Sequence, residues 1–574
     1  MDYRKEYERW LTSPYLTEDE RAAVRAVTSE EEKELAFGRT LEFGTAGLRS
    51  SMAMGPGRMN VHTVAHATQG MAELILKNGG AERGCVIGYD SRHNSALFSR
   101  VAAEVLAAAG IRVYLFDGMR PTPELSFAVR HLGCMAGINI TASHNPKEYN
   151  GYKAYWEDGA QLSPEDAAVV SDVMARIEVL GGAPRADFDE AVRDGRITLL
   201  GEALDEAYLD AVMATLIDRE LLARAGETLS IVYTPLHGAG ARLVPEALRR
   251  AGLCHVYPVE EQMIPDGDFP TVYKPNPEYA EVFRLGIALA ERVKSDLVIA
   301  TDPDSDRVGV VTRDKDGGFV TISGNEMGAL LLDYIIGARR RVGRLPADAF
   351  TIKSIVSTDR VTEIAARNGV RLFDVLTGFK YIGEVIKEHE ARGEESRFIL
   401  GFEESYGYLV GTHARDKDAV SASLMIAEMA AYYEERGMTL ADALRELDEK
   451  YGVYREKTTE IYMEGLDGIA RQRRVMETLR ETPPITLGDR RITSIGDYSK
   501  GYFTDTATGE RTAITQARSN VLYFITEDGD KVVIRPSGTE PKIKLYFLVH
   551  GATEAEANAK IAAFTEATAT FSRV

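Results

Sequence analysis

Cysteine is scarce in this chain. Cys85, Cys134 and Cys254 are the only three cysteines among 574 residues, and none of them belongs to a CxxC pair. An odd number of widely spaced cysteines in apolar strand contexts predicts reduced, buried thiols. The pattern argues against a disulfide framework and against a structural zinc site.

Long apolar runs are also missing. No stretch approaches the ~20 apolar residues that a membrane-spanning helix needs. The opening residues, MDYRKEYERWLTSPYL, are charged and contain no apolar core of signal-peptide length. We therefore expect a cytoplasmic protein with no membrane partner.

Positive charge is the minority charge. The chain has 68 Lys and Arg against 88 Asp and Glu, for a formal net charge of −20. This balance argues against nucleic acid or an anionic membrane as the main partner. It also means that an anionic substrate would need a local group of Lys and Arg side chains. The apolar content of 44% is that of an ordinary globular protein, and the length predicts about four domains.

Three segments repeat one pattern of strand, polar turn, helix, glycine and strand. They cover residues 86–116, 231–259 and 350–375, and the glycines are Gly110, Gly252 and Gly369. This pattern predicts βα units of a doubly wound sheet, with one unit in each of three domains. Residues 1–36 have helical spacing, with Thr17 as an N-cap. The last quarter alternates short strands, expected over 491–495, 521–525, 531–534 and 543–548, and closes with a helix over 554–567, which predicts an α+β domain.

The first candidate site is Ser143. An apolar strand over 135–140 is followed by the polar loop Thr141-Ala-Ser-His-Asn-Pro146, in which the proline restricts its own backbone and that of Asn145. Open α/β sheets place reactive groups at the carboxyl ends of such strands. A hydroxyl that only closes a turn or caps a helix is the alternative. The polar and cationic residues from Tyr149 to Lys153 favour a nucleophile.

The second candidate site is a carboxylate triplet. Asp302, Asp304 and Asp306 directly follow an apolar strand and precede Arg307. Three carboxylates on one loop repel one another unless a cation lies among them, and oxygen ligands suit Mg²⁺. A calcium EF-loop is excluded, because its sixth and twelfth positions would be Arg307 and Arg313 instead of Gly and Glu. An exposed acidic turn remains the alternative.

Three further elements carry groups that suit a sugar phosphate. Gly44-Thr-Ala-Gly47 with Arg49 offers backbone N–H groups and a guanidinium to an anion, although a glycine hairpin is equally compatible. Arg535, Ser537, Gly538 and Thr539 form a compact phosphate cradle, with a decorated β-turn as the alternative. Glu403, Glu404 and Ser405 offer hydrogen-bond acceptors for hydroxyls, although paired Glu residues are also common at helix starts.

The tetrapeptide Arg-Asp-Lys-Asp occurs twice, and its two settings lead to different predictions. At 313–316 it lies between two short strands and is followed by a glycine pair, so we expect a hairpin turn there. At 415–418 it follows Gly411-Thr-His413 without a glycine pair. There we expect a functional loop.

These motifs resemble those of one family, the α-D-phosphohexomutases. TASHNPKEYNGYK resembles the family's phosphoserine loop, DPDSDR its metal loop, GTAGLR its GT-x-GLR element, GFEES its sugar loop and RPSGTEP its phosphate loop. Thr377-Gly378-Phe-Lys380 is a shorter match to a loop that touches the sugar's other face. The matches keep the family's order over nearly the whole chain. GTAGLR and RDKD are most similar to the longer phosphoglucomutase-like subgroup.

The resemblance implies the fold. Three related α/β domains with mixed sheets and a smaller α+β C-terminal domain would surround one central cleft. The implied boundaries are 1–205 for the phosphoserine domain, 206–320 for the metal-binding domain, 321–450 for the sugar-binding domain and 451–574 for the phosphate-binding domain.

The resemblance also implies the activity. The chain would interconvert glucose 1-phosphate and glucose 6-phosphate through a phosphorylated Ser143, with Mg²⁺ as cofactor and glucose 1,6-bisphosphate as intermediate and activator. Positioning and charge neutralisation supply the rate of such a transfer. The implied site residues are Ser143, Asp302, Asp304 and Asp306 for metal; Arg49 and Arg307 beside the transferred group; His144 to orient the serine; Thr377, Gly378, Glu403 and Ser405 on the sugar; and Arg535, Ser537, Gly538 and Thr539 on the idle phosphate.

The general base is open at this stage. Lys417 is the first choice, with Lys153 and His413 as alternatives, because a lysine crowded by other cations has a lowered pKa.

The substrate is also open. A phosphomannomutase, a phosphopentomutase, a sugar-1,6-bisphosphate synthase and an inactive sugar-phosphate-binding scaffold are the alternative functions. The sequence leaves a monomer and a homodimer equally open.

Overall fold

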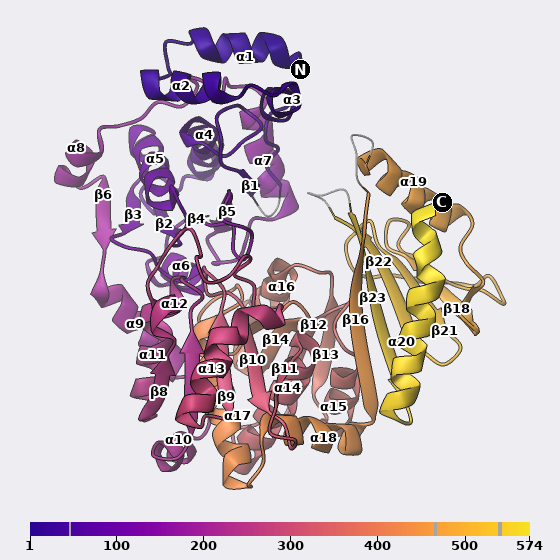
Figure 1. Cartoon of the computed structure of the whole chain (residues 1–574). Coiled ribbons are helices and arrows are strands. Elements are labelled where there is room, and N and C mark those ends of the chain that lie inside the picture. Colours follow the sequence, from indigo (N-terminus) through magenta and orange to yellow (C-terminus); the bar gives the residue numbers. More distant parts are fainter. Residues whose placement is uncertain (45–46, 464–467, 538–541, 574) are drawn as a thin grey trace.

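The computed structural model describes residues 1–44, 47–463, 468–537 and 542–573 (Figure 1). Four sheets organise this part of the chain, and three of them combine parallel and antiparallel strands. The fourth is antiparallel throughout. This confirms the predicted α/β fold with mixed sheets and an α+β C-terminal part. None of the helices in the described part is both long and apolar enough to cross a membrane.

The first sheet has the strand order β1-β5-β4-β2-β3-β6. It consists of β1 (Leu48–Ser51), β2 (Cys85–Tyr89), β3 (Val113–Phe116), β4 (Ala136–Ile140), β5 (Tyr149–Trp156) and β6 (Ile197–Leu200). The helices of this unit are α4 (Val61–Lys77), α5 (Ser95–Ala108), α6 (Thr122–His131), α7 (Pro164–Met174), α8 (Phe188–Arg193) and α9 (Glu202–Met213).

Before this unit, the N-terminal segment forms three short helices. They are α1 (Tyr3–Thr12), α2 (Glu18–Ala26) and α3 (Glu30–Phe37). Thr17 caps α2 through a capping box with Glu20, as predicted. Trp10 and Phe37 of this N-terminal segment pack against Val179 and Leu180 of the first unit. The segment lies at one end of the molecule (Figure 1).

The second and third sheets have the orders β11-β10-β9-β7-β8 and β13-β12-β14-β15. The second unit contains α10 (Arg219–Ala225), β7 (Ser230–Thr234), α11 (Gly240–Arg250), β8 (His255–Pro258), α12 (Glu260–Met263), η1 (Ala280–Phe283), α13 (Arg284–Val293), β9 (Leu297–Thr301), β10 (Val308–Arg313) and β11 (Phe319–Ile322). The third contains α14 (Gly324–Arg341), β12 (Phe350–Ser354), α15 (Arg360–Asn368), β13 (Arg371–Val375), α16 (Phe379–Glu390), η2 (Glu395–Arg397), β14 (Phe398–Glu403), β15 (Gly407–Leu409), α17 (Ala419–Glu435) and α18 (Leu440–Tyr451).

The fourth sheet follows the order β16-β23-β22-β21-β18-β19-β20, with β17 beside β18. Its elements are β16 (Val453–Tyr462), α19 (Gly468–Glu481), β17 (Thr486–Leu487), β18 (Arg490–Asp497), β19 (Tyr502–Asp505), β20 (Arg511–Ala513), β21 (Leu522–Thr526), β22 (Lys531–Pro536), β23 (Lys542–Gly551), α20 (Glu554–Thr568) and η3 (Ala569–Arg573). The predicted strands near 491–495, 521–525, 531–534 and 543–548 and the closing helix are all present.

The predicted βα units are confirmed. Gly110, Gly252 and Gly369 follow helices α5, α11 and α15 with φ of +75°, +96° and +68°, which explains the glycine at each of these turns. The two Arg-Asp-Lys-Asp segments also differ, and the hairpin turn predicted for the first is confirmed. The first joins the antiparallel pair β10 and β11, whereas all four residues of 415–418 are buried.

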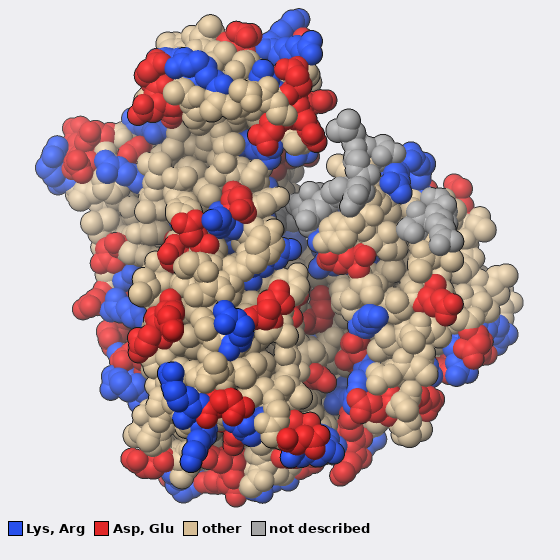
Figure 2. Space-filling model, viewed as in Figure 1, with Lys and Arg blue, Asp and Glu red and all other residues tan. Residues whose placement is uncertain are grey.

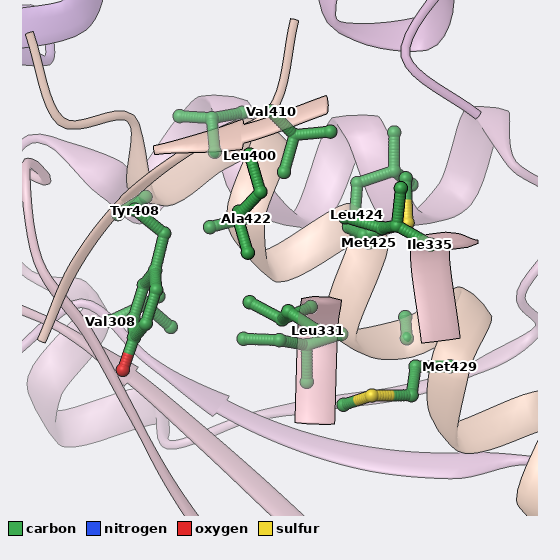
Figure 3. Packing of buried hydrophobic residues seen from close by; sticks show 14 of the residues in the cluster. Val308, Leu331, Ile335, Leu400, Tyr408, Val410, Ala422, Leu424, Met425 and Met429 are labelled. Carbon is green, nitrogen blue, oxygen red and sulfur yellow. The ribbon is translucent and has the colours of Figure 1, made fainter. Parts of the chain in front are cut away.

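Helix α17 lies at the centre of the largest hydrophobic cluster. Its apolar side chains, among them Leu424, Met425 and Met429, pack with Leu331 and Ile335 of α14 (Figure 3). A helix that is apolar on nearly all sides is buried on all sides. Because the buried segment 415–418 leads directly into α17, this packing fixes the loop that carries Lys417.

The fourth unit docks on the third through a smaller cluster. Ile355, Val356 and Leu376 of the third unit pack against Tyr523 and Tyr546 of the fourth. Lys531 also pairs with Asp359 at 2.7 Å across this boundary. Above the docking surface, the molecular surface is hollowed between the first unit and the fourth (Figure 2).

One prediction about the cysteines is wrong. Cys85 and Cys134 are buried and reduced as expected, but Cys254 is exposed. Cys254 lies between α11 and β8, and its Sγ is 3.7 Å from Glu227 Oε1. An apolar sequence context therefore did not mean burial at this position.

Candidate active site

Ser143 lies in a buried loop at the carboxyl end of β4. Its side chain is 3% exposed, and its Oγ donates a hydrogen bond to Asp302 Oδ2 at 2.7 Å. The Oγ is also 3.1 Å from His144 Nδ1. The backbone of Ser143 has φ of +51°, a left-handed conformation that costs a non-glycine residue free energy. The surrounding structure therefore holds the hydroxyl in a conformation that the loop alone would not favour.

Arg92 holds this loop from behind. Its guanidinium donates to the carbonyl oxygens of Ser143 and Asn145, at 2.5 Å each, and to those of Pro146 and Tyr149 at 2.9 and 3.1 Å. The residue is 3% exposed. Four carbonyls of one loop thus share a single buried cation.

Asp90 joins Arg92 to the start of the same loop. Its carboxylate lies 3.4 Å from Arg92 Nε and accepts a 2.6 Å hydrogen bond from Thr141 Oγ1. Thr141 Oγ1 in turn accepts from the backbone N–H of Ser143 at 2.8 Å. Burial lowers the pKa of Arg92, which the Asp90 charge partly offsets. The sequence reasoning missed both residues, although Tyr89-Asp-Ser-Arg92 follows a buried strand as the other site loops do.

Replacing Arg92 by Met should therefore loosen the nucleophile loop. We expect kcat to fall about 10²-fold and the unfolding free energy to fall by about 3 kcal/mol, because Asp90 and four carbonyls lose a buried partner. Urea unfolding and steady-state kinetics measure the two effects. Arg100→Met, which removes an exposed ion pair with Glu104, is the control and should change neither. Parent-like kcat in Arg92→Met would contradict this role.

Strained backbone is concentrated around this loop. Eight described residues other than glycine have φ in the left-handed region, and four of them lie in the loops of the site or contact their residues: Ser143, Phe269, Ser305 and Tyr406. Arg92 stacks over the Phe269 ring, and Tyr406 O accepts the backbone N–H of Val308, which follows the metal loop. Such strain is typical of sites whose geometry the fold imposes.

The three carboxylates converge. Asp302, Asp304 and Asp306 are all buried, and one oxygen from each lies within 4.8 Å of the others. In the described chain this is the one group of His, Cys, Asp and Glu side chains that could hold a metal ion. Burial, and then the charges of Asp304 and Asp306, raise the pKa of Asp302 well above its ordinary value. A cation among these carboxylates would relieve that repulsion.

The donor set fits a hard divalent ion. Asp304 Oδ1 and Asp306 Oδ1 are buried without a hydrogen-bond partner among the described residues. Orphaned carboxylate oxygens of this kind are costly unless a metal ion or water satisfies them. With Ser143 Oγ on Asp302, the group offers only oxygen ligands, which Mg²⁺ prefers.

Two residues that the sequence reasoning missed anchor the carboxylates. Thr122 donates its hydroxyl to Asp304 Oδ2 at 2.7 Å and its backbone N–H to Asp304 O at 2.8 Å. Asn139 Nδ2 donates to that threonine hydroxyl at 2.7 Å. Both residues belong to the first unit, so the metal loop of the second unit is fixed by contacts across the boundary.

Two lysines reach the same carboxylates. Lys153 Nζ is 2.7 Å from Asp304 and 2.9 Å from Asp306, and Lys417 Nζ is 3.3 Å from Asp306 and 2.8 Å from Asp416. Burial lowers the pKa of each lysine, but the neighbouring carboxylates outweigh it and the pKa of both is raised. The argument that crowding cations lower the pKa of Lys417 is therefore wrong, because its nearest neighbours are anions.

Of the remaining charged residues, three lie at the metal and nucleophile loops, and His413 lies near the start of α17. Arg307 lies at the metal loop, 3.9 Å from Asp306 and bound to Glu278 at 2.5 Å, and exposed Arg49 donates to Asn145 of the nucleophile loop. Burial, followed by Arg307 and Arg49, holds the pKa of His144 well below its ordinary value. His413 instead binds Asp418 at 2.7 Å beside the ring of Tyr208, so its contacts support the start of α17.

The sugar-loop residues lie at the end of β14. Glu403 is buried and accepts the N–H of Gly378 at 2.7 Å, which joins the two predicted sugar-contacting segments. Ser405 follows in the turn before β15, and Glu404 accepts from Ser354 Oγ at 3.0 Å. Thr377 Oγ1 is buried and has no hydrogen-bond partner among the described residues.

The phosphate loop lies on the fourth sheet, at the junction of β22 and β23. Arg535 is paired with Lys544 in register, and Ser537 N donates to Lys542 O at 2.8 Å, which closes the neck of the loop. Gln472 of α19 donates to both Ser537 O and Lys542 O. The predicted residues Gly538 and Thr539 lie outside the described part of the chain.

Comparisons with known proteins agree with this arrangement. Models of the phosphoglucomutase/phosphomannomutase α/β/α domains I, II and III match residues 40–180, 206–317 and 323–451, and the model of the C-terminal domain matches residues 504–567. A phosphoglucomutase of Staphylococcus saprophyticus is 37% identical over 522 residues, which cover 90% of this chain and 92% of that protein.

Solved structures share the fold. Parafusin from Paramecium, described as a phosphoglucomutase in its open form, has a TM-score of 0.68 and 18% identity, covering 93% of this chain and 96% of its own. An N-acetylphosphoglucosamine mutase of Aspergillus fumigatus, solved with GlcNAc-6P and magnesium, has a TM-score of 0.51 and 13% identity, covering 100% and 99%. Four consecutive domain matches and the staphylococcal relative place this chain in the phosphoglucomutase/phosphomannomutase family, the α-D-phosphohexomutases.

Proposed function

We propose that this chain is a phosphoglucomutase that interconverts glucose 1-phosphate and glucose 6-phosphate through a phosphorylated Ser143 and glucose 1,6-bisphosphate. The observation that carries the proposal is the 2.7 Å hydrogen bond from Ser143 Oγ to Asp302. It brings a loop hydroxyl and a buried carboxylate triplet, from two different units, into one site. Membership of an isomerase family and a phosphoglucomutase relative at 37% identity support the same activity.

Ser143 would carry the phosphoryl group, and Asp302, Asp304 and Asp306 would hold Mg²⁺ with the serine oxygen. A divalent ion there supplies charge neutralisation on the transferred group. Lys153, Arg307 and Arg49 provide the local positive charge that an overall acidic protein needs at a phosphate site. His144, with its depressed pKa, would act as a neutral imidazole that orients the serine hydroxyl.

Lys417 remains our proposed general base, with Lys153 as the alternative. Its position at the site supports this role, since its Nζ lies 3.3 Å from Asp306. Because the carboxylates outweigh burial and raise its pKa, the amine could accept a proton only with a metal ion neutralising them. His413 is the weakest of the three choices, because its imidazole is committed to Asp418.

The sugar would lie between the nucleophile loop and the end of β14. Glu403 and Ser405 would accept its hydroxyls, and Thr377 and Gly378 would contact its other face. Arg535 and Ser537, with Gly538 and Thr539, would hold whichever phosphate is idle, so one clamp would serve both half-reactions. The domain boundaries at 205, 320 and 450, the cytoplasmic location and a monomeric or dimeric state stay predictions.

The activity can be measured directly. Purified protein with Mg²⁺ and a trace of glucose 1,6-bisphosphate should convert glucose 1-phosphate to glucose 6-phosphate, with kcat in the common range of about 1–10³ s⁻¹. Mannose 1-phosphate and ribose 1-phosphate, assayed in parallel, test the alternative substrates. Faster conversion of either would replace glucose as the assigned substrate. Binding of glucose 1-phosphate without turnover would favour the scaffold.

A further inference from the structure

Two neighbouring strands of the fourth sheet place a carboxylate beside two lysines. In the register of β16 and β23, Glu460 lies opposite Lys544 and Tyr462 lies opposite Lys542. Glu460 Oε1 is 3.1 Å from Lys542 Nζ and 3.5 Å from Lys544 Nζ. The Tyr462 hydroxyl donates to Glu460 Oε2 at 2.6 Å. One carboxylate is thus held against both lysines that follow the phosphate loop.

The same row continues to the phosphate loop itself. Lys544 lies opposite Arg535 on its other side, so Arg535, Lys544 and Glu460 form a row across three strands. Residues directly opposite in a sheet share a face and interact. Two cations side by side are unfavourable unless an anion lies near them. Glu460 provides that anion within the chain, at the end of the row.

This face of the sheet is turned towards the third unit, because Tyr546, two positions after Lys544 on β23, packs against Ile355 and Val356. Burial and the charge of Glu403 raise the pKa of Glu404 in the sugar loop, and Lys544 lies close enough to oppose this rise slightly. Glu460 and Lys542 likewise act on the pKa of Tyr279 of the second unit. The carboxylate therefore sits where a sugar phosphate bound by Arg535 would lie close to it.

We propose that Glu460 is a built-in counter-charge that weakens phosphate binding at the clamp. A phosphate that binds Arg535 and the two lysines must share these cations with the Glu460 carboxylate, which it also repels. The proposal rests on the mutase function proposed above, in which Glu460 would assist the release of phosphate from the clamp. The clamp has to release one phosphate of the bisphosphate and bind the other in each turnover. Very high affinity for phosphate would therefore lower kcat.

The neutral variant Glu460→Gln tests this. Titration of the full-length protein with inorganic phosphate should give a Kd about three- to tenfold lower than that of the parent, the effect of removing one nearby, partly screened negative charge. KM for glucose 1-phosphate should fall by a similar factor. The kcat should fall as well, because the idle phosphate leaves the clamp more slowly. A variant that only lost structure would raise KM instead.

Glu554→Gln is the matched control. Glu554, at the start of α20, pairs at 3.2 Å with Arg455, which lies on β16 as Glu460 does but near the end away from the phosphate loop. The Glu554→Gln variant changes the net charge by the same amount as Glu460→Gln and should leave the phosphate Kd within twofold of the parent. In a Lys542→Gln background, the effect of Glu460→Gln should shrink, because the pair no longer exists.

The two proposals fail in different ways. Parent-like phosphate affinity in Glu460→Gln, or an equal gain in Glu554→Gln, would overturn the inference while mutase activity stands. Tighter phosphate binding in a protein that converts none of the sugar phosphates would support the counter-charge and overturn the proposed mutase function.

Discussion

Ser143→Ala should abolish turnover of glucose 1-phosphate, with a loss of at least about 10⁴-fold in kcat. In the proposed mechanism this hydroxyl carries the phosphoryl group between half-reactions, and its Oγ lies 2.7 Å from Asp302. Alanine bears the same backbone penalty at φ of +51° as serine does. The unfolding free energy should therefore change by no more than about 1.5 kcal/mol, the net worth of a lost hydrogen bond.

Three measurements make this result specific. Urea unfolding shows that the variant is folded, and calorimetry with glucose 1-phosphate should give a Kd within a few-fold of the parent. Ser423→Ala removes a buried serine hydroxyl from α17, one with no partner in the described chain, and should leave kcat unchanged. A Ser143→Ala enzyme that turns over substrate at the parent rate would refute the phosphoserine mechanism.

Removing the metal should be nearly as severe. Chelation should lower kcat by at least about 10³-fold, and added Mg²⁺ should restore it, because charge neutralisation by the metal contributes several kcal/mol to such reactions. Mg²⁺ should also raise the Tm of the parent, since a ligand that binds only the folded state stabilises it.

Asp302→Asn distinguishes an effect on metal binding from an effect on the stability of the fold. Burial and the charges of Asp304 and Asp306 raise the pKa of Asp302, so the neutral amide should make the metal-free protein as stable as the parent or more stable. The same variant should lose most of its Mg²⁺-dependent gain in Tm and its activity. Asp489→Asn, at an exposed aspartate, is the charge-matched control. Mg²⁺-dependent stabilisation that persists unchanged in Asp302→Asn would place the metal elsewhere.

Local signals explain what the sequence predicted well. The glycines at 110, 252 and 369 mark helix ends because the chain needs positive φ there, and hydrophobic periodicity marks the strands beside them. Both signals act within a few residues. Ser143 and Asp302 each follow the carboxyl end of a strand, as expected for reactive groups in α/β sheets. The two strands belong to different sheets, so only the family resemblance implied that these residues share one site.

What the sequence reasoning missed depends on contacts between distant segments. Arg92 serves a loop that begins about fifty residues later, and Thr122 meets Asp304 across 182 residues. The pKa of Lys417 was predicted with the wrong sign partly for the same reason, because Asp306, which raises it, comes from another unit. Its sequence neighbour Asp416 raises it as well. Strand β16 was missed because it is an edge strand with a charged, largely half-exposed sequence, so it lacks the apolar alternation of a strand with one buried face.

The most direct measurement is the mass of the peptide that contains Ser143. After incubation of the parent protein with glucose 1,6-bisphosphate, peptide mass spectrometry should find one added phosphoryl group on Ser143, and a chase with excess glucose 6-phosphate should remove it. An unmodified Ser143, or a phosphoryl group on another residue, in a preparation that actively interconverts the two glucose phosphates would contradict the account.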